Sequence, residues 1–96
     1  MLSTLAALAE PNRFRIVELL RSGPRHVGEI ERRLELRQPQ VSKHLRVLRE
    51  AGLVVSTVEA QRRSYELRQQ PFRELDEWLE GHRSYWEARR PTLRST

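Results

Sequence analysis

The residues from 38 to 54 constrain this chain most, because they combine an apolar helical stripe with a basic face. Val41, Leu45 and Leu48 recur at i, i+4 and i+7, the spacing that aligns side chains along one side of a helix. No acidic residue occurs between residues 37 and 49. At about 100° per residue, the side opposite the stripe carries Ser42, Lys43, Arg46 and Arg49. Such side chains can bond base edges and phosphates, so this face is predicted to bind a polyanion rather than only water.

Composition supports one small basic domain spanning residues 1–96. The 96 residues include 18 Lys and Arg against 13 Asp and Glu, for a net charge of +5, which favours an anionic partner such as nucleic acid. The absence of Cys excludes disulfides and thiolate metal sites. No apolar run is long enough to span a membrane, and the apolar start lacks the basic leader of a signal peptide. We therefore expect a cytoplasmic protein with no membrane partner.

The chain reads as mostly α with one small β-hairpin, an α+β fold. Helices are expected over residues 3–9, 11–21, 27–34 and 38–51, the last of these ending at Gly52. Strands are expected over 53–58 and 64–67, with residues 59–63 as their linker. The helix over 11–21 is predicted to be central to the core, with an apolar face of Phe14, Ile16, Val17, Leu19 and Leu20. Two short helices, a turn, a basic helix and a hairpin form a winged helix-turn-helix.

A last helix, expected over about 71–90, carries a wide apolar and aromatic stripe. The stripe consists of Phe72, Leu75, Trp78, Leu79, Tyr85 and Trp86. This is more apolar surface than the end of a small monomer needs, so the helix is predicted to face a second copy of the chain. His82 lies on the same stripe and is expected at that dimer seam. The last helix is predicted to pack with its two-fold mate and with the Leu2, Leu5 and Leu8 face of the first helix. The alternative is a helix folded back onto its own core.

Four segments, in order and spacing, resemble the ArsR/SmtB family of bacterial repressors. They are residues 9–20, 27–30, 38–54 and 62–67, of which 38–54 is the most specific, and the likeness extends over about residues 5–90. The spacing from Leu75 to Trp86 resembles a subgroup without metal sites. The resemblance implies a homodimer that pairs through its first and last helices, binds a palindromic operator in double-stranded DNA and blocks transcription.

The resemblance also implies which residues contact DNA. They are Gln38, Gln40, Ser42, Lys43 and Arg46 on the recognition helix and Arg62 and Arg63 on the wing. Gln40, Ser42 and Lys43 are expected to read bases, whereas Arg46 and Arg49 hold phosphates and the wing arginines reach the backbone or minor groove.

Three positions depart from the family pattern. Arg37 stands where a Ser or Thr usually caps the recognition helix, and an unfavourable cap costs about 1 kcal/mol. Glu35 replaces the usual turn glycine, and Gln61 replaces the usual wing glycine. None of these changes removes a predicted DNA contact.

The metal sites associated with the family are not matched. One site needs Cys, and the site on the last helix needs Asp-x-His followed by His-x-x-Glu, whereas Asp76 is followed by Glu77 and Trp78. His44 is expected to pack at the core edge, and His26 is expected at the surface. Glu74, Asp76 and Glu77 share their helix with arginines and indicate a solvated face rather than a catalytic pair. We therefore expect no metal, no cofactor and no enzyme activity.

The sequence thus predicts a homodimeric, metal-independent winged-helix repressor. The sequence leaves two alternatives open. One is a metal- or ligand-responsive sensor of the same fold. The other is a protein–protein module in which the winged helix is a scaffold and the aromatic helix is the working surface.

Overall fold

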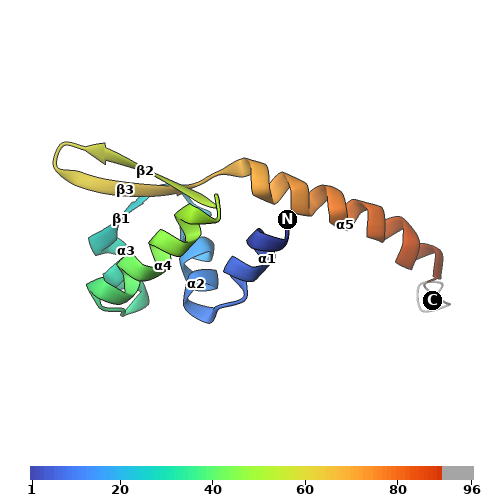
Figure 1. Ribbon diagram of the computed structural model, residues 1–96, viewed down its shortest axis with the longest axis horizontal. Helices are drawn as coiled ribbons and strands as arrows, with labels where there is room; N and C mark the ends of the chain where they lie inside the picture. Colours follow the sequence, from blue (N-terminus) through green and yellow to red (C-terminus); the bar gives the residue numbers. More distant parts are fainter. Residues whose placement is uncertain (90–96) are drawn as a thin grey trace.

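The computed structural model describes residues 1–89, which form five helices and one three-stranded sheet (Figure 1). In chain order these elements are α1 (Leu2–Leu8), α2 (Pro11–Leu20), β1 (Arg25–His26), α3 (Val27–Leu34), α4 (Gln38–Glu50), β2 (Val54–Glu59), β3 (Arg62–Leu67) and α5 (Gln69–Arg89). The strand order is β1-β3-β2, and both pairings are antiparallel. Helices α3 and α4 with the β2–β3 hairpin are the predicted winged helix-turn-helix.

The core lies where α2, α3 and α4 meet the start of the hairpin. Val41, Leu45 and Leu48 of α4 are each at most 1% exposed, so the predicted apolar stripe is confirmed. Phe14 was expected in the core, and that expectation is wrong because its side chain is 50% exposed. Phe14 lies about 200° around α2 from the fully buried Ile16. A short helix packed on one side buries one face only.

The recognition helix begins without the usual hydroxyl cap. Glu35 ends α3 in the left-handed conformation at φ 56°, a backbone region that favours glycine. The backbone N–H of Arg37 donates to Oε1 of Gln40 at 3.0 Å. This is one of the two hydrogen bonds of a capping box, so the N-terminus of α4 is capped by Gln40, a side chain of its own first turn. At the other end Gly52 takes φ 83°, as its predicted role requires.

The wing is longer and tighter than expected. Glu59 pairs with Arg62, so only Ala60 and Gln61 form the loop, and Ala60 takes φ 58°. Arg62 and Arg63 therefore belong to β3 and not to a linker. Strand β1 was not predicted, and it places His26 opposite Ser64. His26 is half-buried there and not at the surface as expected, with its Nδ1 atom fully buried.

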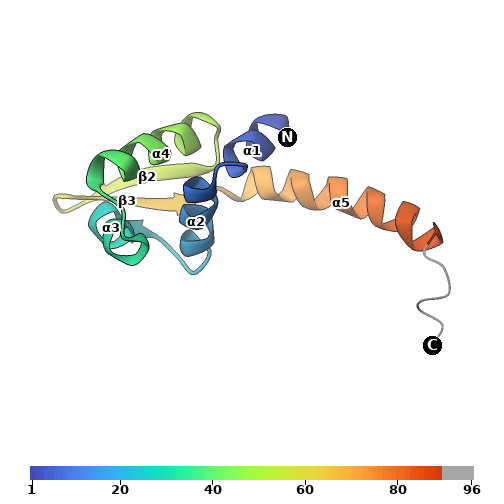
Figure 2. The same cartoon turned by 90° about the horizontal axis from the view of Figure 1, so that it is seen from below.

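Helix α5 projects away from the body of the molecule, opposite to the wing tip (Figures 1 and 2). The radius of gyration is 16.8 Å, against roughly 12–13 Å for a compact domain of this length. Every described residue from Asp76 to Arg89 is exposed, so α5 does not fold back onto its own core. The helix starts two residues earlier than expected, and its predicted last residue, Arg90, lies outside the described residues. None of the helices in residues 1–89 is long and apolar enough to cross a bilayer.

Candidate nucleic-acid interface

The solvent face of α4 is the one expected from its periodicity. Ser42, Lys43, Arg46 and Arg49 are all exposed, on the side opposite the buried stripe. They border a helix groove of about 410 Å³, whose lining is Pro39, Ser42, Lys43, Arg46, Arg49 and Tyr65. Helix α4 therefore buries one face in the domain and presents a hydroxyl and three cations on the other.

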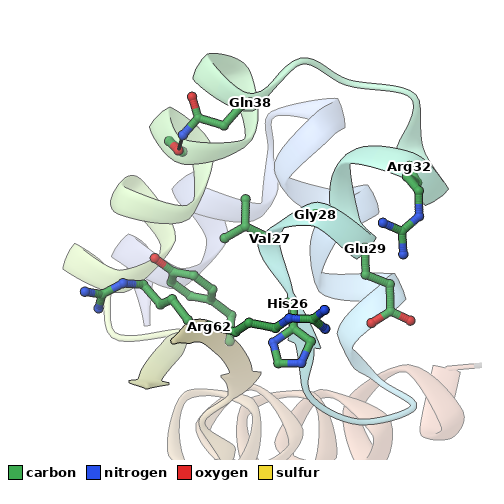
Figure 3. Close-up of a pocket in the computed structure, with 10 residues that line it drawn as sticks. His26, Val27, Gly28, Glu29, Arg32, Gln38 and Arg62 are labelled. Carbon is green, nitrogen blue, oxygen red and sulfur yellow. Dashed lines mark hydrogen bonds between the residues drawn. The ribbon is translucent and has the colours of Figure 1, made fainter. Parts of the chain in front are cut away.

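A second, larger groove of about 640 Å³ lies between α3, α4 and the wing. Figure 3 shows Gln38 of α4, Val27 of α3 and Arg62 of β3 arranged around it. Ser42, Arg63 and Tyr65 also line this wing groove. Because Ser42 and Tyr65 line both grooves, the helix groove and the wing groove form one surface that runs from α4 to the wing.

Five cations of this surface have no carboxylate partner among the described residues, and Glu29, which also lines the wing groove, is paired with Arg25. Within residues 1–89, Lys43, Arg46, Arg49, Arg62 and Arg63 make no ion pair. Three arginines elsewhere in residues 1–89 are paired with carboxylates: Arg21 with Glu18 at 2.8 Å, Arg25 with Glu29 at 2.6 Å and Arg83 with Glu80 at 3.2 Å. Unpaired guanidinium and ammonium groups on one surface create a positive potential that attracts phosphates.

The polar side chains at the start of α4 are partly committed to one another. Gln38 Nε2 donates to Ser42 Oγ at 2.6 Å, which leaves the hydroxyl proton of Ser42 free to donate elsewhere. Gln40 uses its oxygen to cap the helix, so its amide NH₂ group is what remains for another partner. The two glutamines thus orient the first turn of α4 besides lying on its exposed face.

The wing arginines leave β3 in different directions, because successive residues of a strand alternate between faces. Arg63 Nη1 donates to Ser56 Oγ of the neighbouring strand at 3.2 Å. The guanidinium of Arg62 makes no hydrogen bond or ion pair with another described residue, although both arginines line the wing groove. Of the two, Arg62 is the freer to follow a phosphate backbone.

Two residues of this surface were not singled out from the sequence. Arg32 of α3 is exposed and lines the wing groove. Tyr65 is only 8% exposed and lies between the recognition helix and the wing, at the border of both grooves. Arg32 gave no signal of its own in a chain rich in arginine, whereas Tyr65 stands next to Arg62 and Arg63 in the 62–67 segment.

His44 connects the buried side of α4 to the start of α2. It is 8% exposed, as expected for packing at the core edge, and its Nδ1 lies 3.8 Å from Oε1 of Glu10. Glu10 caps α2 by accepting from the backbone N–H of Arg13 at 2.8 Å. That hydrogen bond lowers the pKa of Glu10 below its usual 4.5, and His44 lowers the pKa further. This contact is structural and faces away from the cationic surface.

The histidines do not converge. His26, His44 and His82 lie on β1, α4 and α5, and the ring of His82 packs against Trp78 in a tilted arrangement, with 4.2 Å between centroids. Within the part of the chain that the structure describes, no three His, Asp or Glu side chains are grouped so that they could hold a metal ion.

Known proteins with similar sequences share this fold. Residues 10–56 match the arsR family of bacterial regulatory proteins. The HTH-type transcriptional regulator Rv2034 of Mycobacterium tuberculosis is 48% identical over 61 residues, which cover 64% of this chain and 57% of that protein. The biofilm growth-associated repressor of Agrobacterium fabrum is 44% identical over 63 residues, covering 66% and 54%. The chain thus spans little more than half the length of these two curated relatives.

A third relative is matched over most of both chains. The transcriptional activator HlyU of Vibrio cholerae is 39% identical over 84 residues, which cover 88% of this chain and 76% of HlyU. The solved structure of HlyU from Vibrio cholerae superposes with a TM-score of 0.72 at 38% identity, covering 88% of this chain and 89% of that one. The match includes the turn, the recognition helix and the wing. The chain therefore belongs to the arsR family of bacterial regulatory proteins.

Proposed function

We propose that this protein is a regulator of transcription that binds double-stranded DNA as a homodimer and represses from a palindromic operator. The observation that carries the proposal is the continuous surface from α4 to the wing, whose cations have no carboxylate partner within residues 1–89. In this proposal α4 enters the major groove, where Gln40, Ser42 and Lys43 contact base edges. Arg46, Arg49, Arg62 and Arg63 contact the phosphate backbone, and Gln38 orients Ser42.

The proposed dimer forms through α5 and α1. The exposed stripe of α5 includes Trp78 at 44%, Leu79 at 55% and Trp86 at 47% exposure, and Leu2 of α1 is 77% exposed. Met1 at the start of α1 lies 3.9 Å from Glu74 of α5 through its amino group, so the two helices adjoin. The predicted interface residues are Leu2, Leu5, Leu8, Phe72, Leu75, Leu79, His82 and Trp86. A two-fold dimer places its recognition helices about 34–36 Å apart, one turn of B-DNA.

The proposed repressor acts without a metal ion. Its three imidazoles lie on separate elements, and transition metals need several nitrogen or sulfur ligands at fixed geometry. Operator affinity should therefore be unchanged by low micromolar Zn²⁺, Ni²⁺, Co²⁺ or Cd²⁺. A loss of more than about tenfold that disappears in His82→Ala would contradict this part of the proposal.

The function is tested by selecting bound sequences from a pool of random duplex DNA with the full chain. The proposal predicts enrichment of one inverted repeat with half-sites one helical turn apart. Affinity for it should fall steeply with salt, as phosphate contacts release counterions. Transcription in vitro from a promoter that overlaps the repeat should decrease when the protein is added. Failure to enrich any sequence, with binding insensitive to salt, would favour a protein–protein module instead.

A further inference from the structure

A groove of about 570 Å³ lies at the root of α5, where the last helix joins the body. Three elements line this root groove: α2, the end of β3 and the first two turns of α5. Its lining residues are Val17, Glu18, Arg21, Leu67, Arg68, Gln69, Phe72, Arg73 and Asp76. The volume falls within the range of about 300–1,000 Å³ that is usual for small-molecule sites. None of these residues belongs to the proposed DNA-binding surface, and only Phe72 is also among the predicted dimer-interface residues.

The floor of the root groove is apolar. Val17 is 4% exposed and belongs to the core, and Leu67 and Phe72 are partly buried against it. These three side chains come from three different elements, so a molecule seated on them touches α2, β3 and α5 together. Apolar surface of this kind favours the hydrocarbon part of a ligand over water.

The rim of the root groove carries two guanidinium groups without an acidic partner. Arg68 Nη1 donates only to the carbonyl oxygen of Gly52, at 3.4 Å, and Arg73 Nη2 donates to Oε1 of Gln69, at 3.1 Å. Within residues 1–89 neither arginine makes an ion pair, whereas Arg21 on the same rim is paired with Glu18 at 2.8 Å. Five N–H donors per guanidinium leave most of the capacity of Arg68 and Arg73 unused.

We propose that the root groove binds a small organic monocarboxylate with an aromatic or branched hydrocarbon part. The carboxylate accepts hydrogen bonds from Arg68 and Arg73, a pairing for which guanidinium geometry is well suited. The hydrocarbon part covers Val17, Leu67 and Phe72. Asp76 on the same rim disfavours a second negative charge, which selects a monoanion over a dianion.

The position of the groove gives such a ligand a regulatory effect, which rests on the function proposed above. Helix α5 has no buried residue beyond its first turns, so the root sets its direction relative to the body. A ligand that contacts both α2 and α5 favours one direction over others. In a dimer formed through α5, that direction sets the distance between the two recognition helices and hence the operator affinity.

The test titrates isotope-labelled full-length protein with phenylbutyrate and follows the backbone amide resonances by NMR. Saturable shifts are expected at residues of the root groove, with a dissociation constant in the low millimolar range for a probe of this size. The neutral analogue phenylbutanol should bind at least fivefold more weakly. The double variant Arg68→Gln/Arg73→Gln should lose about tenfold in affinity for phenylbutyrate. Arg83→Gln/Arg89→Gln, which removes the same charge farther along α5, should bind it as the unaltered chain does.

Three outcomes would contradict the proposed binding site. They are no saturable binding of phenylbutyrate, equal affinity for phenylbutyrate and phenylbutanol, or undiminished affinity of Arg68→Gln/Arg73→Gln for phenylbutyrate. If that variant instead shifts the dimer dissociation constant tenfold without ligand, the groove is covered by the second copy. Operator affinity is measured separately, with and without saturating phenylbutyrate, and a change of at least threefold is expected. Unchanged affinity overturns the regulatory role, whereas a ligand-free protein that binds no DNA overturns the proposed function and leaves the site standing.

Discussion

Helices α4 and α5 are both amphipathic, but they leave opposite kinds of group without a partner. Helix α4 buries its apolar stripe in its own domain and leaves Lys43, Arg46 and Arg49 without carboxylates within residues 1–89. Helix α5 leaves its apolar stripe exposed, and the arginines of its distal half have local partners. Arg83 pairs with Glu80 at 3.2 Å, and Arg89 lies over the Tyr85 ring at 3.8 Å. The group that a helix leaves unsatisfied indicates the chemistry of its partner.

The free energies of hydration and of apolar burial favour different partners for the two helices. An exposed guanidinium is well hydrated, so α4 is stable as it stands and gains from phosphates only when DNA is present. An exposed Leu forgoes about 1.5–3 kcal/mol of burial. The α5 stripe exposes Leu79 together with the larger side chains of Trp78, Tyr85 and Trp86. Helix α5 is therefore stabilised more by packing against a protein surface, whereas α4 gains more from contact with nucleic acid.

The largest expected effect comes from placing a charge on the α5 stripe. Leu79→Glu removes the burial of Leu79 in the proposed dimer and buries a carboxylate without a partner. The dimer dissociation constant should rise at least about 100-fold, corresponding to a loss of roughly 3 kcal/mol. Sedimentation equilibrium measures this change, and Glu80→Gln on the neighbouring solvated position is the control. An unchanged dimer would show that α5 faces something other than a second copy.

The next effect is on the α4 side. Lys43→Ala should weaken operator binding by about 1–3 kcal/mol and relax the preference at one base pair of each half-site. Ser42→Ala should act in the same direction at its own base pair. The measurement is fluorescence anisotropy with the operator and with duplexes altered at single base pairs. Equal losses on operator and unrelated DNA would make Lys43 a phosphate contact and not a base contact.

A smaller effect is expected at the wing. Arg62→Ala should weaken binding to all duplexes alike, because a phosphate contact carries no sequence information. The slope of log affinity against log salt concentration should decrease in magnitude by about 0.9, the value for one phosphate contact. Arg63→Ala serves for comparison, since Arg63 is held by Ser56. A change of sequence preference in Arg62→Ala would place this side chain on base edges.

The smallest effect concerns stability at the start of α2. The pKa of Glu10 is lowered by the Arg13 backbone hydrogen bond, so the charged carboxylate stabilises the fold. This contribution is present above about pH 4.5, the ordinary value, and is lost as the pH falls through the lowered pKa. Glu10→Gln should cost about 0.5–1 kcal/mol at neutral pH and remove part of the acid dependence. Urea unfolding of both proteins at pH 7 and pH 3 measures the loss of stability and its pH dependence. An equal loss of stability at the two pH values would contradict the stabilising role of the Glu10 carboxylate.

The sequence sufficed to predict the features that follow from local periodicity and backbone chemistry. The stripe of Val41, Leu45 and Leu48 placed α4 and its exposed face correctly, and Gly52 marked its end. The aromatic stripe correctly indicated that the apolar side chains of α5 would not be buried against the core of the same chain. These signals are local, so they do not depend on how distant segments meet.

What sequence reasoning missed depends on tertiary contacts. Strand β1 has two residues and exists because β3 passes beside it, so no pattern within it could reveal it. Phe14 is apolar but lies on the side of α2 that nothing covers. Gln40 as a helix cap, Tyr65 between helix and wing, and the root groove each require residues from separate elements to be placed in space.

The central claim is that charge on the α4 surface, and not charge in general, binds DNA. Two double variants remove the same two positive charges from the two helices: Lys43→Ala/Arg46→Ala on α4 and Arg83→Ala/Arg89→Ala on α5. The most direct measurement is the operator affinity of both as a function of salt. The α4 variant should lose at least about tenfold in affinity and, through the phosphate contact of Arg46, about 0.9 of salt slope, whereas the α5 variant should stay within about twofold in affinity. Equal losses in the two variants would contradict the account.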